Sequence, residues 1–158
     1  MEQAEEIIRY TRKVLENHVK GEEIPGPPDE NFFKEKKGVF VTLKEEGDLR
    51  GCIGLPRPDK KLGEAVRRAA KSASEDPRFS PLQEEELNDT VIEVTVLTKP
   101  EKITVKNPDN LPSKVGVGKD GLIVESGINQ GLLLPQVPVE HDWDPKEFLS
   151  KTCQKAGL

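Results

Sequence analysis

The chain has 158 residues, of which 34% are charged and only 4% aromatic, and its net charge at pH 7 is −5. That length allows one domain with its own hydrophobic core. The acidic net charge disfavours a general affinity for nucleic-acid backbones. No apolar run approaches the roughly 18 residues that a membrane span needs. The acidic N-terminus is unlike a signal peptide and the two cysteines lack partners at metal-ligand spacing, so we expect a cytoplasmic protein with free thiols and no metal site.

The first half of the chain predicts a helix, a hairpin and a second helix. Apolar residues recur at helical spacing over residues 2–20, and Gly21 ends that helix. After a proline-rich connector, two β-rich runs at 38–43 and 49–55 flank a polar turn, which is typical of a hairpin. An alanine-rich helix is then expected at about 61–75.

The middle of the chain predicts a turn, a short helix and two strands. The turn is Asp76-Pro77-Arg78-Phe79, and Ser80-Pro81-Leu82-Gln83 resembles the start of a short helix that ends near Asn88. Residues 91–98 give the clearest strand pattern, and we expect residues 102–105 to pair nearby.

The C-terminal part predicts a second hairpin and a well-capped helix. Residues 121–125 and 131–134 form the two arms, and the helix spans 144–156. Asp144 is placed as its N-cap, Pro145 as its first residue and Glu147 at the third position of a capping box. Trp143 and Phe148 have the spacing of a hydrophobic staple, and Cys153 falls on the buried face.

The two hairpins resemble each other in sequence. Gly38-Val39-Phe40-Val41 is similar to Gly121-Leu122-Ile123-Val124, and Gly51–Pro56 is similar to Gly131–Pro135. Each hairpin is followed by a proline-containing connector and a helix. This pattern indicates a duplicated hairpin–helix unit.

The candidate site is the segment Leu49-Arg50-Gly51-Cys52-Ile53-Gly54. Two glycines in a core strand are unusual, because glycine loses much entropy on ordering and packs nothing, so we expect a close neighbour or a ligand there. Strand alternation turns Leu49, Ile53 and Leu55 toward the helices, and sends Arg50, Cys52 and Gly54 to the opposite face.

The same alternation places Glu93 and Thr95 on that opposite face, with Ile92, Val94 and Val96 inward. The binding set is therefore Arg50, Gly51, Cys52, Gly54, Glu93 and Thr95, and Cys52 is the candidate catalytic residue, since Arg50 would favour its thiolate. The alternative is a structural Arg50–Glu93 ion pair beside an inert thiol. A Cys–His nucleophile would need His18 or, better placed, His141.

Five ordered motifs resemble the AMME syndrome candidate gene 1 protein family. They are Leu49–Gly54, Asp76–Phe79, Glu93–Thr98, Gly131–Val137 and Thr152–Leu158, and they span nearly the whole chain as one domain of that type. The resemblance implies an α+β fold with a curved, largely antiparallel sheet flanked by helices, in two unequal lobes with a cleft. Members of the family usually continue past the position of Leu158 with a further segment and a last strand, so we expect that tail to be missing here.

The resemblance supplies no reaction, and whether the chain is an enzyme stays open. We expect it to bind a small molecule or peptide in a cleft beside Leu49–Gly54, as an enzyme or enzyme component of a modification pathway; the alternative is a non-catalytic interaction or regulatory module, with direct nucleic-acid binding less favoured. Family context suggests Memo-like or radical S-adenosylmethionine proteins as partners. No cofactor is expected, and the excess of Glu and Lys indicates a heat-adapted source.

Overall fold

The computed structural model describes all 158 residues, which form two compact units of unequal length, Met1–Lys99 and Pro100–Leu158. Both units combine helices with an antiparallel sheet, so the expected α+β class is confirmed. No helix in the structure has both the length and the apolar character that crossing a membrane requires.

The first unit is built on a three-stranded sheet with the order β2-β1-β3. Its strands are β1 (Gly38–Glu45), β2 (Asp48–Leu55) and β3 (Thr90–Leu97), and its helices are α1 (Glu2–Lys20), the short α2 (Asn31–Lys34) and α3 (Leu62–Ser74). A 3-10 turn, η1 (Glu84–Glu86), precedes β3. Since β1 is central, β2 and β3 are both edge strands.

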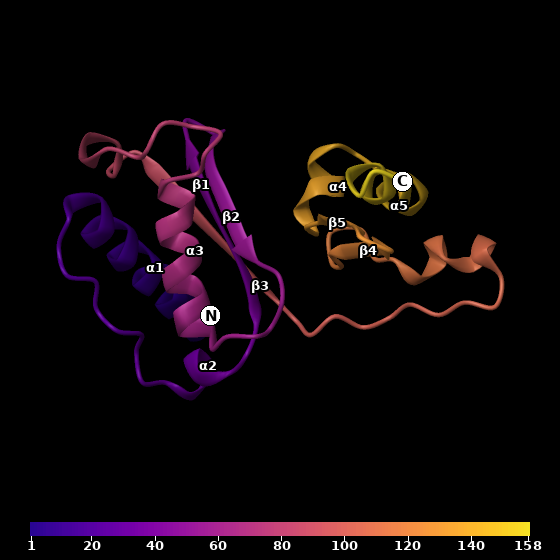
Figure 1. The fold of residues 1–158 in the computed structure, drawn as a ribbon, viewed down its shortest axis with the longest axis horizontal. Helices are drawn as coiled ribbons and strands as arrows, with labels where there is room; N and C mark the ends of the chain where they lie inside the picture. The colour runs from indigo at the N-terminus through magenta and orange to yellow at the C-terminus, as the bar shows by residue number, and fades with distance from the viewer. The chain divides into compact units, whose positions relative to one another are not determined.

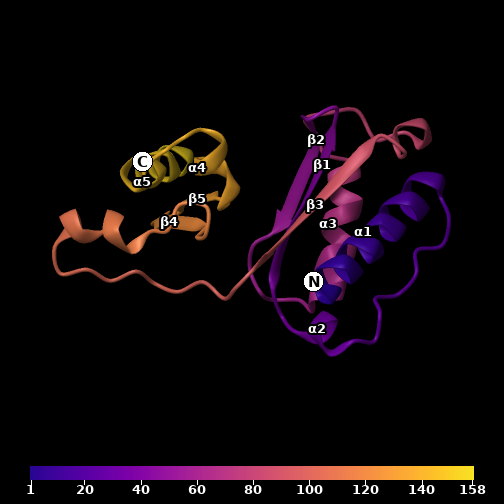
Figure 2. The ribbon, with the colours of Figure 1, turned by 180° about the vertical axis from the view of Figure 1, so that it is seen from behind.

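One face of this sheet is covered by helices. Helix α3 lies in front of the strands in Figure 1 and behind them in Figure 2, and it contacts β1 and β2, while α1 contacts α3 and β3. The core between them is aliphatic, with Val39, Val41 and Leu43 of β1 fully buried against Val66 and Ala70 of α3. The alanine face of α3 lets its backbone approach the sheet closely.

The second unit packs a two-stranded sheet against a helix. Its elements are the 3-10 turns η2 (Pro108–Asn110) and η3 (Pro112–Lys114), the hairpin β4 (Leu122–Ser126) and β5 (Asn129–Leu133), the short α4 (Gln136–Glu140) and α5 (Pro145–Lys155). Helix α5 contacts both strands. Its core is small, with Val115, Leu122 and Phe148 buried.

The cap of α5 agrees with its prediction in atomic detail. The Asp144 carboxylate accepts from the Glu147 backbone N–H at 2.8 Å, and the Glu147 carboxylate accepts from the Asp144 N–H at 3.0 Å. Trp143 packs against the cluster that contains Phe148. The sequence therefore located this helix start correctly.

Some expected elements differ. Residues 102–105 form no strand, and the expected short helix after Ser80 is reduced to η1, with Gln83 in the cap position. Cys153 is only partly buried. The short helices α2 and α4 were not expected, because a single helical turn leaves no periodicity that a sequence pattern can reveal.

The two hairpin–helix units share a packing detail that involves their glycines. A Cβ added to Gly51 would collide with the Ala73 carbonyl oxygen of α3, and one added to Gly131 would lie 2.7 Å from the Thr152 carbonyl oxygen of α5. Gly38 and Gly121 in turn each abut the end of the paired strand, at Pro56 and at Leu133 respectively. The second unit differs in having the short helix α4 between its hairpin and α5, and the duplication stays a prediction.

Candidate functional site

The candidate segment forms β2, at one edge of the first sheet. Gly51, Cys52, Ile53, Gly54 and Leu55 pair with Leu43, Thr42, Val41, Phe40 and Val39 of β1. Ile53 and Leu55 pack against the helix-covered core, as expected. Cys52 and Gly54 consequently lie on the opposite face.

A β-bulge breaks the register at the start of this segment. Leu43 lies opposite Gly51, but the next residue of β1, Lys44, lies opposite Leu49, so Arg50 is the extra residue on β2. The bulge turns Leu49 away from the core, and its side chain is 42% exposed. The expectation that Leu49 packs inward is therefore wrong.

Arg50 binds Glu86, not Glu93. Its Nε and Nη2 atoms donate to the two Glu86 carboxylate oxygens at 2.7 and 3.1 Å, and Nη1 donates to the Ser80 carbonyl at 2.9 Å. This bidentate pair lowers the pKa of Glu86. The predicted Arg50–Glu93 contact is wrong, because the bulge moves Arg50 out of the alternation that would have carried it to the face shared with Glu93.

Glu93 and Thr95 do lie on the predicted face. Glu93 is opposite Thr42 in the register, and Thr95 is opposite Phe40, while their neighbours Val94 and Val96 pack on the core. The Glu93 carboxylate accepts from Lys44 Nζ at 2.8 Å. The structure thus brings Cys52, Thr42 and Glu93 into one row across the sheet, and leaves Arg50 outside it.

Both glycines of the segment have structural explanations. Gly51 faces α3 where the Ala73 carbonyl approaches it, and Gly54 lies under the Phe40 ring, which occupies the place a side chain would take. The expectation of a close neighbour is confirmed at both positions. The neighbour is the protein itself, so the glycines give no separate indication of a ligand.

The outer edge of β2 is held by the turn Asp76-Pro77-Arg78-Phe79. The Cys52 N–H donates to Asp76 Oδ2 at 2.9 Å, and the Cys52 carbonyl accepts from Arg78 Nη2 at 3.3 Å. Arg78 also donates to Asp76 through Nε at 3.1 Å and Nη2 at 2.7 Å. The turn therefore satisfies the backbone groups that an edge strand would otherwise leave unpaired.

In this turn a buried carboxylate is paired with an exposed guanidinium. The Asp76 side chain is 1% exposed whereas that of Arg78 is 57% exposed. The hydrogen bond from Arg78, aided by the Cys52 and Arg78 backbone amides, holds the pKa of Asp76 well below its usual range, although burial opposes this. A buried, ionised aspartate thus orients an exposed guanidinium whose Nη1 amino group has no assigned acceptor.

The Cys52 side chain lies between two polar groups. Its Sγ is 3.2 Å from Thr42 Oγ1, and the backbone carbonyl of the same residue accepts from Arg78 Nη2 at 3.3 Å. The positive group beside the thiol is therefore Arg78, where the sequence pointed to Arg50. The sequence signal that could have indicated Arg78 was the Asp-Pro-Arg turn. An aspartate and an arginine two residues apart can together bind the backbone N–H and carbonyl of an edge strand.

The two histidines have partners other than Cys52. His18 Nε2 lies 2.9 Å from the Glu75 carboxylate, and the His141 ring stacks on Trp143 with centroids 4.8 Å apart. One shallow cavity, with a volume of about 440 Å³, lies beside His18 and Glu75. Another, with a volume of about 390 Å³, lies in the second unit. Arg50, Cys52, Glu93 and Thr95 line neither.

Comparison with known proteins settles the family. The AMMECR1 family model matches residues 8–158. The chain belongs to the AMMECR1 family. It is 50% identical over 155 residues to a protein of Methanothermobacter thermautotrophicus, covering 96% of this chain and 81% of the relative, and 49% identical over 165 residues to one of Thermococcus onnurineus, covering 99% and 80%.

A solved AMMECR1-type structure has the same fold. The crystal structure of the uncharacterized protein PH0010 from Pyrococcus horikoshii matches with a TM-score of 0.91 and 50% identity, over 99% of this chain and 81% of that one. The family and fold indicated by the five motifs are thereby confirmed. These relatives come from heat-adapted archaea, in agreement with the charge-rich composition.

Proposed function

We propose that this AMMECR1-family protein binds a small molecule or peptide at the outer edge of β2, beside Cys52. The observation that carries the proposal is the Asp76–Arg78 pair. A carboxylate that is 1% exposed binds a guanidinium whose side chain is 57% exposed, so that a solvent-accessible cationic side chain is held in one orientation. Binding groups held rigidly in this way lose little entropy when a ligand arrives.

The chemistry of this edge favours a ligand with a carbonyl or carboxylate oxygen. Arg78 offers guanidinium donors, and its Nη2 group binds the backbone carbonyl of Cys52, so the positive charge lies at the residue that carries the thiol. A thiol beside a fixed positive charge is a better nucleophile than an isolated one. In its simpler form the proposal is that a ligand binds at this edge without reacting. In its fuller form the Cys52 thiol also reacts with that ligand.

The test is a thermal-shift screen of metabolites, nucleotides and short peptides, with Cys52→Ser and Arg78→Gln alongside the unaltered chain. A ligand of this edge raises the melting temperature of the unaltered chain in proportion to occupancy, and loses that effect in Arg78→Gln. Arg9→Gln, on α1 and away from β2, is the matched control. A ligand whose shift survives Arg78→Gln binds elsewhere and contradicts the proposal.

The reactivity of Cys52 is tested separately. If Arg78 activates the thiol, a small alkylating reagent modifies Cys52 faster than Cys153 in the folded protein, and Arg78→Gln slows the reaction at Cys52 alone. Both thiols are partly exposed, so accessibility by itself predicts similar rates. Equal rates, unchanged in the variant, would leave Cys52 a structural residue.

Docking of a partner protein is the second candidate. It is favoured by Ile128, which is fully exposed at the tip of the β4–β5 hairpin, next to Gly127. The partners suggested by family context, Memo-like or radical S-adenosylmethionine proteins, supply the assay. Binding of a purified Memo-like protein that Ile128→Ser weakens, and Arg78→Gln leaves intact, would favour docking over a ligand site at β2.

A further inference from the structure

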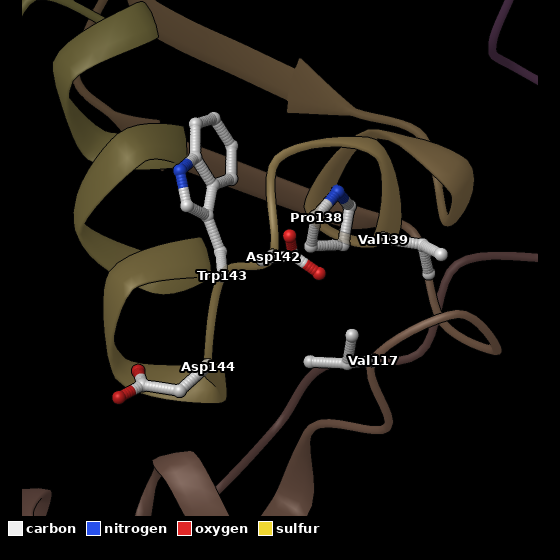
Figure 3. A pocket seen from close by; sticks show the side chains of 6 residues that line it. All are labelled: Val117, Pro138, Val139, Asp142, Trp143 and Asp144. Atoms are coloured by element: carbon white, nitrogen blue, oxygen red, sulfur yellow. The ribbon is translucent and has the colours of Figure 1, made fainter.

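The cavity in the second unit has a composition that points to a ligand of its own. It has a volume of about 390 Å³, at the lower end of the range typical of small-ligand sites, and is lined by Val117, Pro138, Val139, Asp142, Trp143 and Asp144. In Figure 3 the Asp142 carboxylate lies among the labelled side chains, between Trp143 on one side and Pro138 and Val139 on the other. Asp144 points away, since its carboxylate caps α5.

Apolar side chains line the cavity beside that carboxylate, which belongs to an exposed residue. Val139 is 55% exposed and Val117 is 36% exposed, so both present aliphatic surface to solvent at the mouth of the cavity. The Trp143 ring is held by stacking on His141. Lys151 Nζ, 6.0 Å from the centre of the Trp143 ring, shows that this indole accommodates a cation nearby.

Asp142 lies just beyond the end of α4. It has φ 53°, in the left-handed region, where it follows the end of α4. The bonds from the Asp142 N–H to the Val139 carbonyl and from the Trp143 N–H to the Pro138 carbonyl form the helix-ending motif that normally takes glycine or asparagine. Aspartate and asparagine both tolerate this backbone, so the turn fixes the place of the Asp142 side chain at the cavity without selecting its charge.

We propose that this cavity binds the side chain of a lysine from a peptide or protein partner. The ammonium group would pair with Asp142, and the four-carbon stem would lie on Val117, Val139 and Pro138, which matches the two-part chemistry of a lysine side chain. The site lies wholly within the second unit and does not depend on the proposed function of the β2 edge.

Trp143 makes the proposal directly testable, because it is the single tryptophan of the chain. The probe is a blocked Gly-Gly-Lys-Gly-Gly peptide titrated against the full chain, followed by tryptophan fluorescence and by the backbone amide resonances of Val117 and Val139. We expect saturable changes, weakened by added salt. The same peptide with norleucine in place of lysine keeps the aliphatic stem and lacks the charge. It should bind about fivefold more weakly, which is the loss of affinity expected when a partly exposed ion pair is removed.

The decisive variant is Asp142→Asn, which removes the charge and retains a residue that tolerates the left-handed backbone. It should weaken lysine-peptide binding about fivefold and leave norleucine-peptide binding unchanged. Asp109→Asn, in the same unit and outside the cavity, is the matched control and should change neither. Equal binding of both peptides, or unchanged lysine binding in Asp142→Asn, would overturn the proposal, as would the absence of any change in the Val117 and Val139 resonances. Stronger binding of an arginine peptide would overturn the assignment to lysine.

Discussion

Asp76 shows how one side chain can organise the edge of a sheet. Its carboxylate accepts hydrogen bonds from the Cys52 amide and from the backbone and guanidinium of Arg78, and it is almost completely buried. The burial of a charge is tolerated because every contact stabilises the ionised form. Asp76 therefore joins β2 to the turn that follows α3, and its charge state bears on the stability of the first unit.

The stability contributed by Asp76 should depend on pH. Its pKa in the folded protein is lower than the value of about 3.9 for an unfolded chain, so the contribution is full above that value and is lost as the pH falls below it. Asp76→Asn should reduce the free energy of unfolding at pH 7 by roughly 1–3 kcal/mol. Urea denaturation from pH 7 down to pH 2.5 measures this, and the gap between the two proteins should narrow below about pH 4.

The control is Asp89→Asn, which alters an exposed aspartate of the same unit. It should change the free energy of unfolding by less than about 0.5 kcal/mol at every pH. A difference between Asp76→Asn and the unaltered chain that stays constant down to pH 2.5 would contradict the assigned pKa shift.

Helix α5 is the element whose start is specified most completely. Its capping box, the proline at its first position and the packing of Trp143 all act within a few residues. Asp144→Ala should lower stability by about 0.5–2 kcal/mol, because the Glu147 N–H in the first turn loses its side-chain acceptor. Thermal unfolding measures the loss, and Asp144→Ser, which can still cap, should recover most of it. A full loss in the serine variant would show that the cap hydrogen bond is not the cause.

Elements governed by local chemistry were predictable, and those governed by partners distant in the sequence were not. The bounds of α1, α3 and α5 follow from apolar periodicity and from end signals such as Gly21, whose φ is 69°. The bulge at Arg50 carries no such signal, because it depends on how β1 and β2 pair. Because of that extra residue, Leu49 faces away from the core and Arg50 binds Glu86. Cys52 and Gly54 lie on the predicted face of the sheet, whereas Gly51, also in the predicted binding set, faces α3.

At the scale of the whole molecule, the two units have separate hydrophobic cores. The larger cluster draws all its members from residues 1–99 and includes α1, α3 and the three strands, whereas the smaller one, around Phe148, lies entirely within residues 100–158. Buried apolar area is the main favourable contribution to folding. The second unit should accordingly open at a lower free-energy cost than the first.

Equivalent glycines allow this to be tested unit by unit. Gly51 leaves room for a carbonyl of α3 and Gly131 for one of α5, so alanine at either position forces strand and helix apart. With two cores, Gly51→Ala should speed amide hydrogen exchange in β1, β2 and α3, and Gly131→Ala should do so in β4, β5 and α5, each without effect on the other unit. Gly26→Ala, which meets nothing within 4 Å, should leave exchange unchanged and serves as the control. If either substitution lowers protection equally throughout the chain, the molecule unfolds as one cooperative body, and its two cores are not independent units of stability.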